Sequence, residues 1–166
     1  MKKIILLFAC FIFASLYKVY PQQQTITDED NRFSIDIPAG WVHGASKNAF
    51  VHMLICTDTV NLNEKLSISY CKSFYNLSKT YDMNKDAMKD LKNFKIDQEG
   101  EGELSGEKCK WFVFTFESND GSVLMKGKQY TVKKSKSFVI QYILKEKRFD
   151  IMKETFEKMI ATINLK

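Results

Sequence analysis

The sequence has 166 residues, of which 45% are hydrophobic, 13% aromatic and 27% charged. That length is typical of one domain and supplies enough apolar side chains for one packed core. Seven glycines, two prolines and thirteen phenylalanines exclude collagen-like and low-complexity chains and argue against wholesale disorder.

The formal net charge of +5 depends on the first 20 residues, where Lys2, Lys3 and Lys18 are the charged side chains. Removing these three from 25 leaves 22 basic against 20 acidic side chains, a net charge of +2. This excludes a typical basic nucleic-acid-binding protein. The remaining charge is uneven, with −5 over residues 21–120 and +7 over residues 121–166. Two solvated faces of opposite sign are favoured over a device that orients the protein on a charged partner.

Residues 1–21 are predicted to be a signal peptide. A basic start precedes an apolar run from Ile4 to Tyr17 and a polar exit at residues 22–24. The run is shorter than the about 20 residues that a membrane-spanning helix needs. An uncleaved anchor stays open because the small-residue cleavage pattern is poor, whereas lipidation at Cys10 is disfavoured by the bulky Phe8. We expect an exported protein in the periplasm or at the cell surface.

Cys56, Cys71 and Cys109 follow the leader, so at most one internal disulfide can form. Cys56 and Cys71 lie on consecutive strand-like segments and are the preferred pair. The alternative is three buried free thiols.

The chain after the leader is predicted to begin with a flexible polar segment over residues 22–30. Alternating apolar residues then predict a strand over 31–37, a turn at Pro38–Gly40, and further strands near 50–56 and 66–72. The spacing changes to a helical one over 82–94, with Asp82 as the cap, and again over 148–163.

Four strands are predicted between the helices, and tight turns suggest their register. A turn at Asp120–Gly121 pairs Phe114 with Gly127, and a two-residue turn at Lys134–Ser135 pairs Gly127 with Tyr142. A three-residue loop at Ser105–Glu107 places Ile96 opposite Phe116. One face is then expected to carry Ile96, Phe112, Phe114, Phe116, Met125, Phe138, Ile140, Tyr142 and Leu144, with Gly127 making room for two rings.

The opposite face is expected to be apolar as well, because Trp111, Val113, Tyr130, Val132, Val139 and Ile143 alternate with the first set. A sheet that is apolar on both faces must be covered on both. The fold class predicted is therefore α+β, with a largely antiparallel sheet flanked by helices on both faces, an αβα sandwich. One domain is expected over residues 31–166.

The segment Arg32–Trp41 resembles the opening strand and turn of the PsbP-like and DcrB-like domains, with the pattern F-S-I-x-I-P-x-G-W. The order of strands, middle helix, hairpins and final helix is similar too. The resemblance implies an αβα sandwich and a non-enzymatic accessory or docking module. It implies a structural part for these residues, in which Phe33, Ile35 and Ile37 bury a strand and Trp41 packs after the turn.

The sequence contains no recognisable catalytic or cofactor motif. Asp97, Glu99, Glu101 and Glu103 alternate on one predicted strand, so their carboxylates would project from one face about 7 Å apart, close enough for Ca²⁺. A solvated edge strand is the preferred interpretation of this acidic row.

Two classes of function follow. The first is a non-catalytic envelope protein that acts as an accessory or docking module on another envelope protein. The second is a small envelope hydrolase, or an ion-binding or ligand-binding protein, that uses the acidic row with His43 or His52. Contact with a membrane is expected only through the leader or through the basic hairpin that holds Lys126, Lys128, Lys133, Lys134 and Lys136. The hairpin suits anionic lipid or an acidic partner, but lysines at exposed hairpin tips are more often solubility devices than binding sites. A lipid carrier is disfavoured, because the many Phe side chains suggest a filled core.

Overall fold

The computed structural model describes residues 23–47, 51–58 and 65–166. The predicted signal peptide and the polar loop near residues 61–63 lie outside the described residues. No helix within the described ranges is long and apolar enough to cross a membrane.

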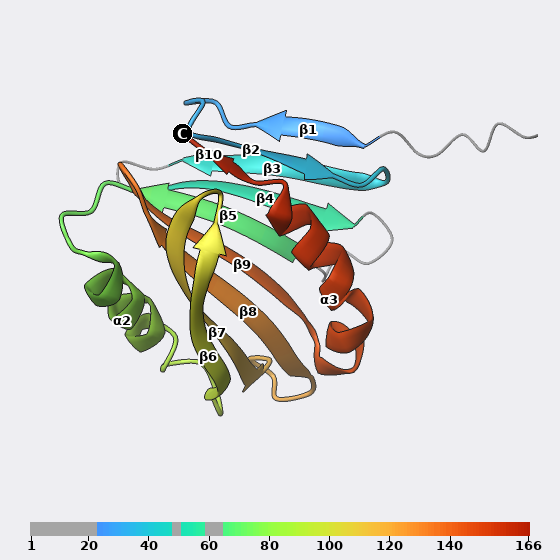
Figure 1. Cartoon of the computed structure of the whole chain (residues 1–166). Coiled ribbons are helices and arrows are strands. Elements are labelled where there is room, and N and C mark those ends of the chain that lie inside the picture. The colour runs from blue at the N-terminus through green and yellow to red at the C-terminus, as the bar shows by residue number, and fades with distance from the viewer. Residues whose placement is uncertain (1–22, 48–50, 59–64) are drawn as a thin grey trace, which may run out of the picture.

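A seven-stranded antiparallel sheet forms the body of the domain (Figure 1). Its strand order is β3-β4-β5-β9-β8-β7-β6, so β3 and β6 are the two edges. The strands are β3 (Trp41–Lys47), β4 (His52–Asp58), β5 (Lys65–Cys71), β6 (Lys95–Leu104), β7 (Glu107–Glu117), β8 (Leu124–Lys133) and β9 (Ser137–Lys145).

A second, smaller sheet lies beside the β3 end of the large one and has the order β1-β2-β10 (Figure 1). Its strands are β1 (Gln24–Thr27), β2 (Phe33–Ile37) and β10 (Asn164–Leu165). Two helices complete the described fold, α2 (Leu77–Ala87) and α3 (Glu146–Ala161). Every strand and helix that is described lies between residues 24 and 165.

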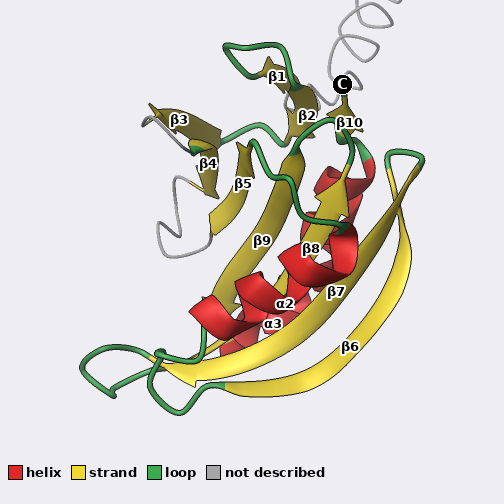
Figure 2. Ribbon diagram, turned by 90° about the vertical axis from the view of Figure 1, so that its left-hand side faces the viewer, coloured by secondary structure: helices red, strands yellow, loops and turns green. Residues whose placement is uncertain are grey.

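The two helices contact opposite faces of the large sheet. Helix α3 packs through Phe156 on Tyr142, with ring centroids 4.9 Å apart. Helix α2 packs through Tyr81 on Phe112 of the other face, with centroids 5.7 Å apart. Figure 2 shows the strong twist of the sheet between them. The prediction of an α+β fold with a mainly antiparallel sheet is confirmed, with a single described helix on each face.

The segment Arg32–Trp41 packs as the family resemblance implies. Phe33, Ile35 and Ile37 are fully buried. Gly40 adopts a φ of 81°, which favours glycine, and the Trp41 amide donates to the Pro38 carbonyl oxygen at 3.2 Å to close the turn.

The front of the chain differs from the sequence analysis in two ways. Residues 22–30 are not simply flexible, because Gln24–Thr27 form β1 and place Ile26 in the core. Trp41–Lys47 form the edge strand β3, which periodicity did not predict. Both strands carry few apolar side chains, so the signal for them in the sequence is weak.

The middle helix begins earlier than predicted. Asn76, with extended backbone, accepts a hydrogen bond from the Lys79 amide at 2.9 Å and caps α2, so Asp82 lies inside the helix. The helix ends at Ala87, and hydrogen-bonded turns carry the chain on to Phe94. The final helix is confirmed to within two residues at each end.

The predicted β7–β8 register is confirmed, since Phe114 lies opposite Gly127. The β8–β9 register is wrong by one residue, because the turn has three residues, 134–136, and Gly127 lies opposite Ile143. The slip moves Phe138, Ile140, Tyr142 and Leu144 to the α3 face, away from Phe112, Phe114 and Phe116.

The β6–β7 register differs for two reasons, each of which shifts the pairing by one residue in the same direction. The turn is the two-residue Ser105–Gly106, and a bulge between Ile96 and Gln98 shifts the rest of β6. Ile96 therefore lies opposite Phe114 instead of Phe116.

Gly127 offers a test of this register. A Cβ there would lie 2.5 Å from Phe114 Cζ and 2.8 Å from the Tyr142 carbonyl oxygen. We expect Gly127→Ala to lower the free energy of unfolding by about 1–3 kcal/mol, because the sheet must shift to admit the methyl group.

Urea unfolding of the full chain measures this change. Gly44→Ala is the matched control, because a Cβ at Gly44 meets nothing within 4 Å. Equal midpoints for Gly127→Ala and the unsubstituted chain would contradict the register.

Candidate functional site

A pocket of about 290 Å³ lies between the small sheet and the β3–β4 edge of the large sheet. Both His43 and His52 line it. Tyr70 and Phe33 are at its inner end, and residues 26–29 of β1 and its following loop form the opposite wall. The pocket thus gathers the two histidines that the sequence offers for acid–base work.

Tyr70, Asp28, Asp30 and His52 form one hydrogen-bonded group, here called the Tyr70 cluster. The Tyr70 hydroxyl oxygen lies 2.8 Å from Asp28 Oδ2, 2.9 Å from Asp30 Oδ2 and 3.1 Å from His52 Nδ1. His52 Nδ1 also lies 2.9 Å from Asp30 Oδ2, and its ring stacks on Tyr70 with centroids 4.8 Å apart.

The cluster joins the two sheets instead of presenting a reactive group. Burial, followed by the hydrogen bonds to Asp28 and Asp30, raises the pKa of Tyr70, so the phenol stays protonated at neutral pH. Asp28 is also occupied by its own turn, because Oδ1 accepts from the backbone amides of Arg32 and Phe33. These contacts tie the β1–β2 loop to β4 and β5.

Although they line the same pocket, His43 and His52 lie far apart along the β3–β4 ladder. His43 lies opposite Cys56 on the β3–β4 ladder, and His52 is four residues from Cys56 along β4. Four residues of a strand span about 13 Å.

The histidines are also remote from the acidic row. The row lies on β6, and five strand-to-strand steps separate β6 from β4. With about 4.8 Å per step, this amounts to roughly 24 Å across the sheet. The structure therefore does not assemble the predicted hydrolase site of His43 or His52 with the acidic row.

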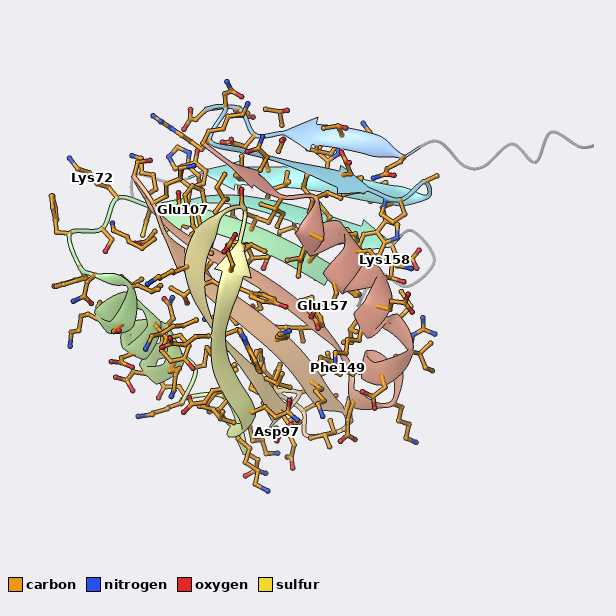
Figure 3. All side chains as sticks on the ribbon, in the orientation of Figure 1. Lys72, Asp97, Glu107, Phe149, Glu157 and Lys158 are labelled. Atoms are coloured by element: carbon orange, nitrogen blue, oxygen red, sulfur yellow. The ribbon has the colours of Figure 1, made fainter. Side chains whose placement is uncertain are left out.

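The acidic row itself is divided by the bulge in β6. The Asp97 carboxylate lies 3.5 Å from Lys126 Nζ, on the α3 side of the sheet, at the lower end of β6 in Figure 3. Glu99 Oε2 lies on the α2 side, where it accepts from Lys85 Nζ at 2.7 Å and from the Tyr81 hydroxyl at 3.0 Å.

The other two acids also face lysines. Glu101 Oε1 lies 3.1 Å from Lys110 Nζ, and Glu103 lies opposite Lys108 in the ladder. The described residues contain no group of three or more His, Cys, Asp or Glu side chains arranged to hold a metal ion. The prediction that the acidic row lies on an edge strand is confirmed, because β6 is an edge of the large sheet.

This geometry predicts that Ca²⁺ does not bind the acidic row, because Asp97 and Glu99 diverge and Ca²⁺ needs six to eight converging oxygens. Isothermal titration of the full chain with Ca²⁺ should give no heat beyond dilution. A saturable isotherm that Glu101→Gln and Glu103→Gln abolish would contradict this expectation.

The cysteines give a further correction. Cys56 lies opposite Leu66, whereas Cys71 lies five residues further along β5 and pairs with Ser137. Five residues of a strand span about 17 Å, and a disulfide requires Cα atoms within about 7 Å. The predicted Cys56–Cys71 disulfide is not formed, and the cysteines in the described residues are free. Burial raises the pKa of the Cys56 thiol to about 12.

A polar group under α3 is not evident from the sequence. Glu157 Oε2 accepts from the Tyr130 hydroxyl at 2.5 Å, and Oε1 accepts from Tyr142 and from Lys128 Nζ, each at 2.9 Å. Burial alone would raise the pKa of Glu157, but the bonds from Tyr130 and Lys128 outweigh it and hold that pKa below its usual value. Figure 3 shows Glu157 between α3 and the sheet.

The tyrosines around Glu157 predict a loss of stability at alkaline pH. Burial and then Glu157 raise the pKa of both Tyr130 and Tyr142, so the fold favours the neutral phenols. The unfolded chain ionises them near pH 10, and above that pH each costs up to about 1.4 kcal/mol of stability per pH unit.

Urea midpoints at about pH 8 and about pH 10.5 measure this dependence. The urea midpoint of Tyr142→Phe should fall less between these two pH values than that of the unsubstituted chain, because the substitution removes one of the phenols. An equal fall for the variant and the unsubstituted chain would contradict the assignment.

A larger concave region lies on the face that α2 occupies. It has a volume of about 610 Å³ and is here called the open groove. Its apolar lining comes from β4, β7, β8, β9 and the loop between β7 and β8, and consists of Met53, Ile55, Phe116, Val123, Met125 and Ile143. Two exposed lysines, Lys65 and Lys145, also line it. The rest of the lining is polar, and its one acidic residue, Asp120, accepts hydrogen bonds from the hydroxyl groups of Ser118 and Ser122. Sequence reasoning missed this groove because the shifted β8–β9 register brings Ile143 and Lys145 to this face.

Neither a protein-family model nor a curated protein matches the sequence. Solved structures do match the fold. Cyanobacterial PsbP from Synechocystis is 14% identical, with a TM-score of 0.63 over 90% of this chain and 96% of that one. This chain has a PsbP-like fold.

Two further solved structures are similar to this chain. LpqN of Mycobacterium tuberculosis, described as involved in cell envelope biogenesis, is 14% identical, with a TM-score of 0.59 over 87% of this chain and 90% of that one. A Bacteroides thetaiotaomicron protein is 14% identical with a TM-score of 0.60, and the match covers 87% of this chain and 49% of that one. At these identities the similarity concerns the fold alone.

Proposed function

We propose that this chain is an exported, non-catalytic accessory protein of the cell envelope that docks another envelope protein in the open groove. The leader supports export, and the involvement of the similarly folded LpqN in envelope biogenesis supports the setting. The helix on each face supports describing the domain as an αβα sandwich.

The groove is the observation that carries the docking function. Apolar side chains line it, and Met53 is 36% exposed at its β4 side. An apolar centre with a charged rim is the usual composition of a protein interface. Met53 and Met125 can adapt their shape to the bound chain, as methionines do at many binding surfaces.

The rim indicates the chemistry of the partner. Lys65 and Lys145 are exposed and lie on adjacent strands, since Lys65 pairs with Ile143 and Lys145 follows two residues later. We expect the partner to insert apolar side chains between carboxylates that meet these two lysines.

The hydrolase alternative has less support. The histidines lie at the β3–β4 side, the acidic row lies at the β6 edge, and the carboxylate of Asp30 is committed to the Tyr70 cluster.

Photo-crosslinking in intact envelopes tests the docking function. A photoreactive residue at Met53 or Val123 of the full chain should crosslink the same envelope protein, and one at Ile151, which is 70% exposed on α3, should not. Lys65→Glu with Lys145→Glu should lower the affinity of the purified protein for this partner at least about tenfold, because like charges then face each other.

Lys147→Glu with Lys153→Glu is the matched control, because it changes the net charge equally on the exposed surface of α3. Crosslinking from Ile151 alone, or no change in affinity on reversing the rim charges, would contradict the proposal. Recovery of the protein in the cytoplasmic fraction would contradict export.

A further inference from the structure

One corner of the molecule combines exposed aromatic rings with lysines. The loop between β5 and α2 carries Phe74 and Tyr75, which are 89% and 52% exposed. Most phenylalanines of the large sheet are buried, as Phe112, Phe114 and Phe138 are, so full exposure of Phe74 is unusual here.

This loop is bound to the turn between β8 and β9. Lys133 Nζ donates to the Ser73 carbonyl oxygen at 2.6 Å. Lys72 Nζ lies 5.4 Å from the centre of the Phe74 ring. Figure 1 shows the loop and the turn at the same corner of the domain, and Figure 3 shows Lys72 there. We call this surface, made of Lys72, Phe74, Tyr75, Lys133 and Lys136, the basic–aromatic tip.

The local charge is one-sided. Residues 65–81 and 122–145 contain no Asp or Glu. Helix α2 starts immediately after the loop, and its first turn holds no acidic residue, so the positive end of the helix dipole adds to the lysines. Lys134 in the same turn differs, because its Nζ lies 3.5 Å from Glu107 Oε1.

This combination fits the surface of an anionic bilayer. Lysines are attracted to anionic headgroups, Tyr is favoured at the headgroup level, and an exposed Phe gains by entering the acyl boundary. Phe74 projects from a loop at a corner, where a flat partner can reach it. A bilayer is favoured over an acidic protein because Phe74 is 89% exposed and is not part of a concave apolar surface such as the open groove.

We propose that the basic–aromatic tip binds the surface of a bilayer that contains anionic phospholipid. The tip and the open groove lie at opposite ends of β8, whose ten residues span about 30 Å, so a partner in the groove and a membrane at the tip can be bound together. The proposal does not depend on the docking function.

Vesicle sedimentation tests it. The test compares the full chain with residues 23–166, which contain every described strand and helix, so that binding by the leader is distinguished from binding by the tip. We expect binding to phosphatidylglycerol–phosphatidylcholine vesicles, little binding to pure phosphatidylcholine, and weaker binding as salt increases.

Variants assign the binding to the tip. Phe74→Ser should weaken it on the order of tenfold, and Lys72→Gln with Lys136→Gln about fivefold per lysine. The matched controls on α3, Ile151→Ser and Lys147→Gln with Lys153→Gln, should bind as the unsubstituted domain does. Phe74 is 89% exposed, so its replacement should leave the urea midpoint unchanged.

A second readout reports insertion directly. Phe74→Trp should retain binding and show a blue shift of tryptophan emission with phosphatidylglycerol vesicles, whereas Ile151→Trp should show none. No binding to anionic vesicles, or equal binding by Phe74→Ser, would overturn the proposal. Binding to a polyglutamate peptide but not to vesicles would also overturn it, in favour of an acidic protein partner.

Discussion

The packing of α3 on Tyr142 joins the parts of this domain. The Tyr142 ring is fully buried and stacks on both Phe149 and Phe156, with centroids 5.6 Å and 4.9 Å apart. Phe156 in turn packs against Trp41 of β3 in a T-shaped arrangement, with ring centroids 5.4 Å apart. One helix thus connects the centre of the large sheet to its β3 edge, and the small sheet packs into the same core through β2.

Polar contacts fix the same arrangement at its margins. Glu157 satisfies the hydroxyl groups of Tyr130 and Tyr142, which would otherwise be costly to bury. The Tyr70 cluster does the same where the β1–β2 loop meets β4 and β5. Because these groups are mutually satisfied, they serve the structure, and the surfaces left for binding lie elsewhere, in the open groove and at the basic–aromatic tip.

The sequence predicts the elements of this fold better than their register. The alternation from Phe33 to Ile37 is unambiguous, because every second side chain is buried. The turn at Lys134–Lys136 is different, since two and three residues are both plausible lengths there and the choice reverses the face of every β9 side chain. The bulge near Asp97 has no sequence signal of its own. It places Asp97 and Glu99 on opposite faces of the sheet, so the predicted acidic row does not form one site. The open groove could not be predicted because the β8–β9 register decides that Ile143 and Lys145 lie on its face. The exposure of Phe74 depends on tertiary packing, which periodicity does not report.

Docking of an envelope partner in the open groove should protect the groove from hydrogen exchange. Hydrogen exchange of the full chain, alone and with solubilised envelope membranes, tests it most directly. We expect the added protection to be confined to the groove strands and loop, namely residues 53–57, 116–125 and 141–145, and β6 to be unchanged. Protection centred on β6 or on the Tyr70 cluster, with none in the groove, would contradict it.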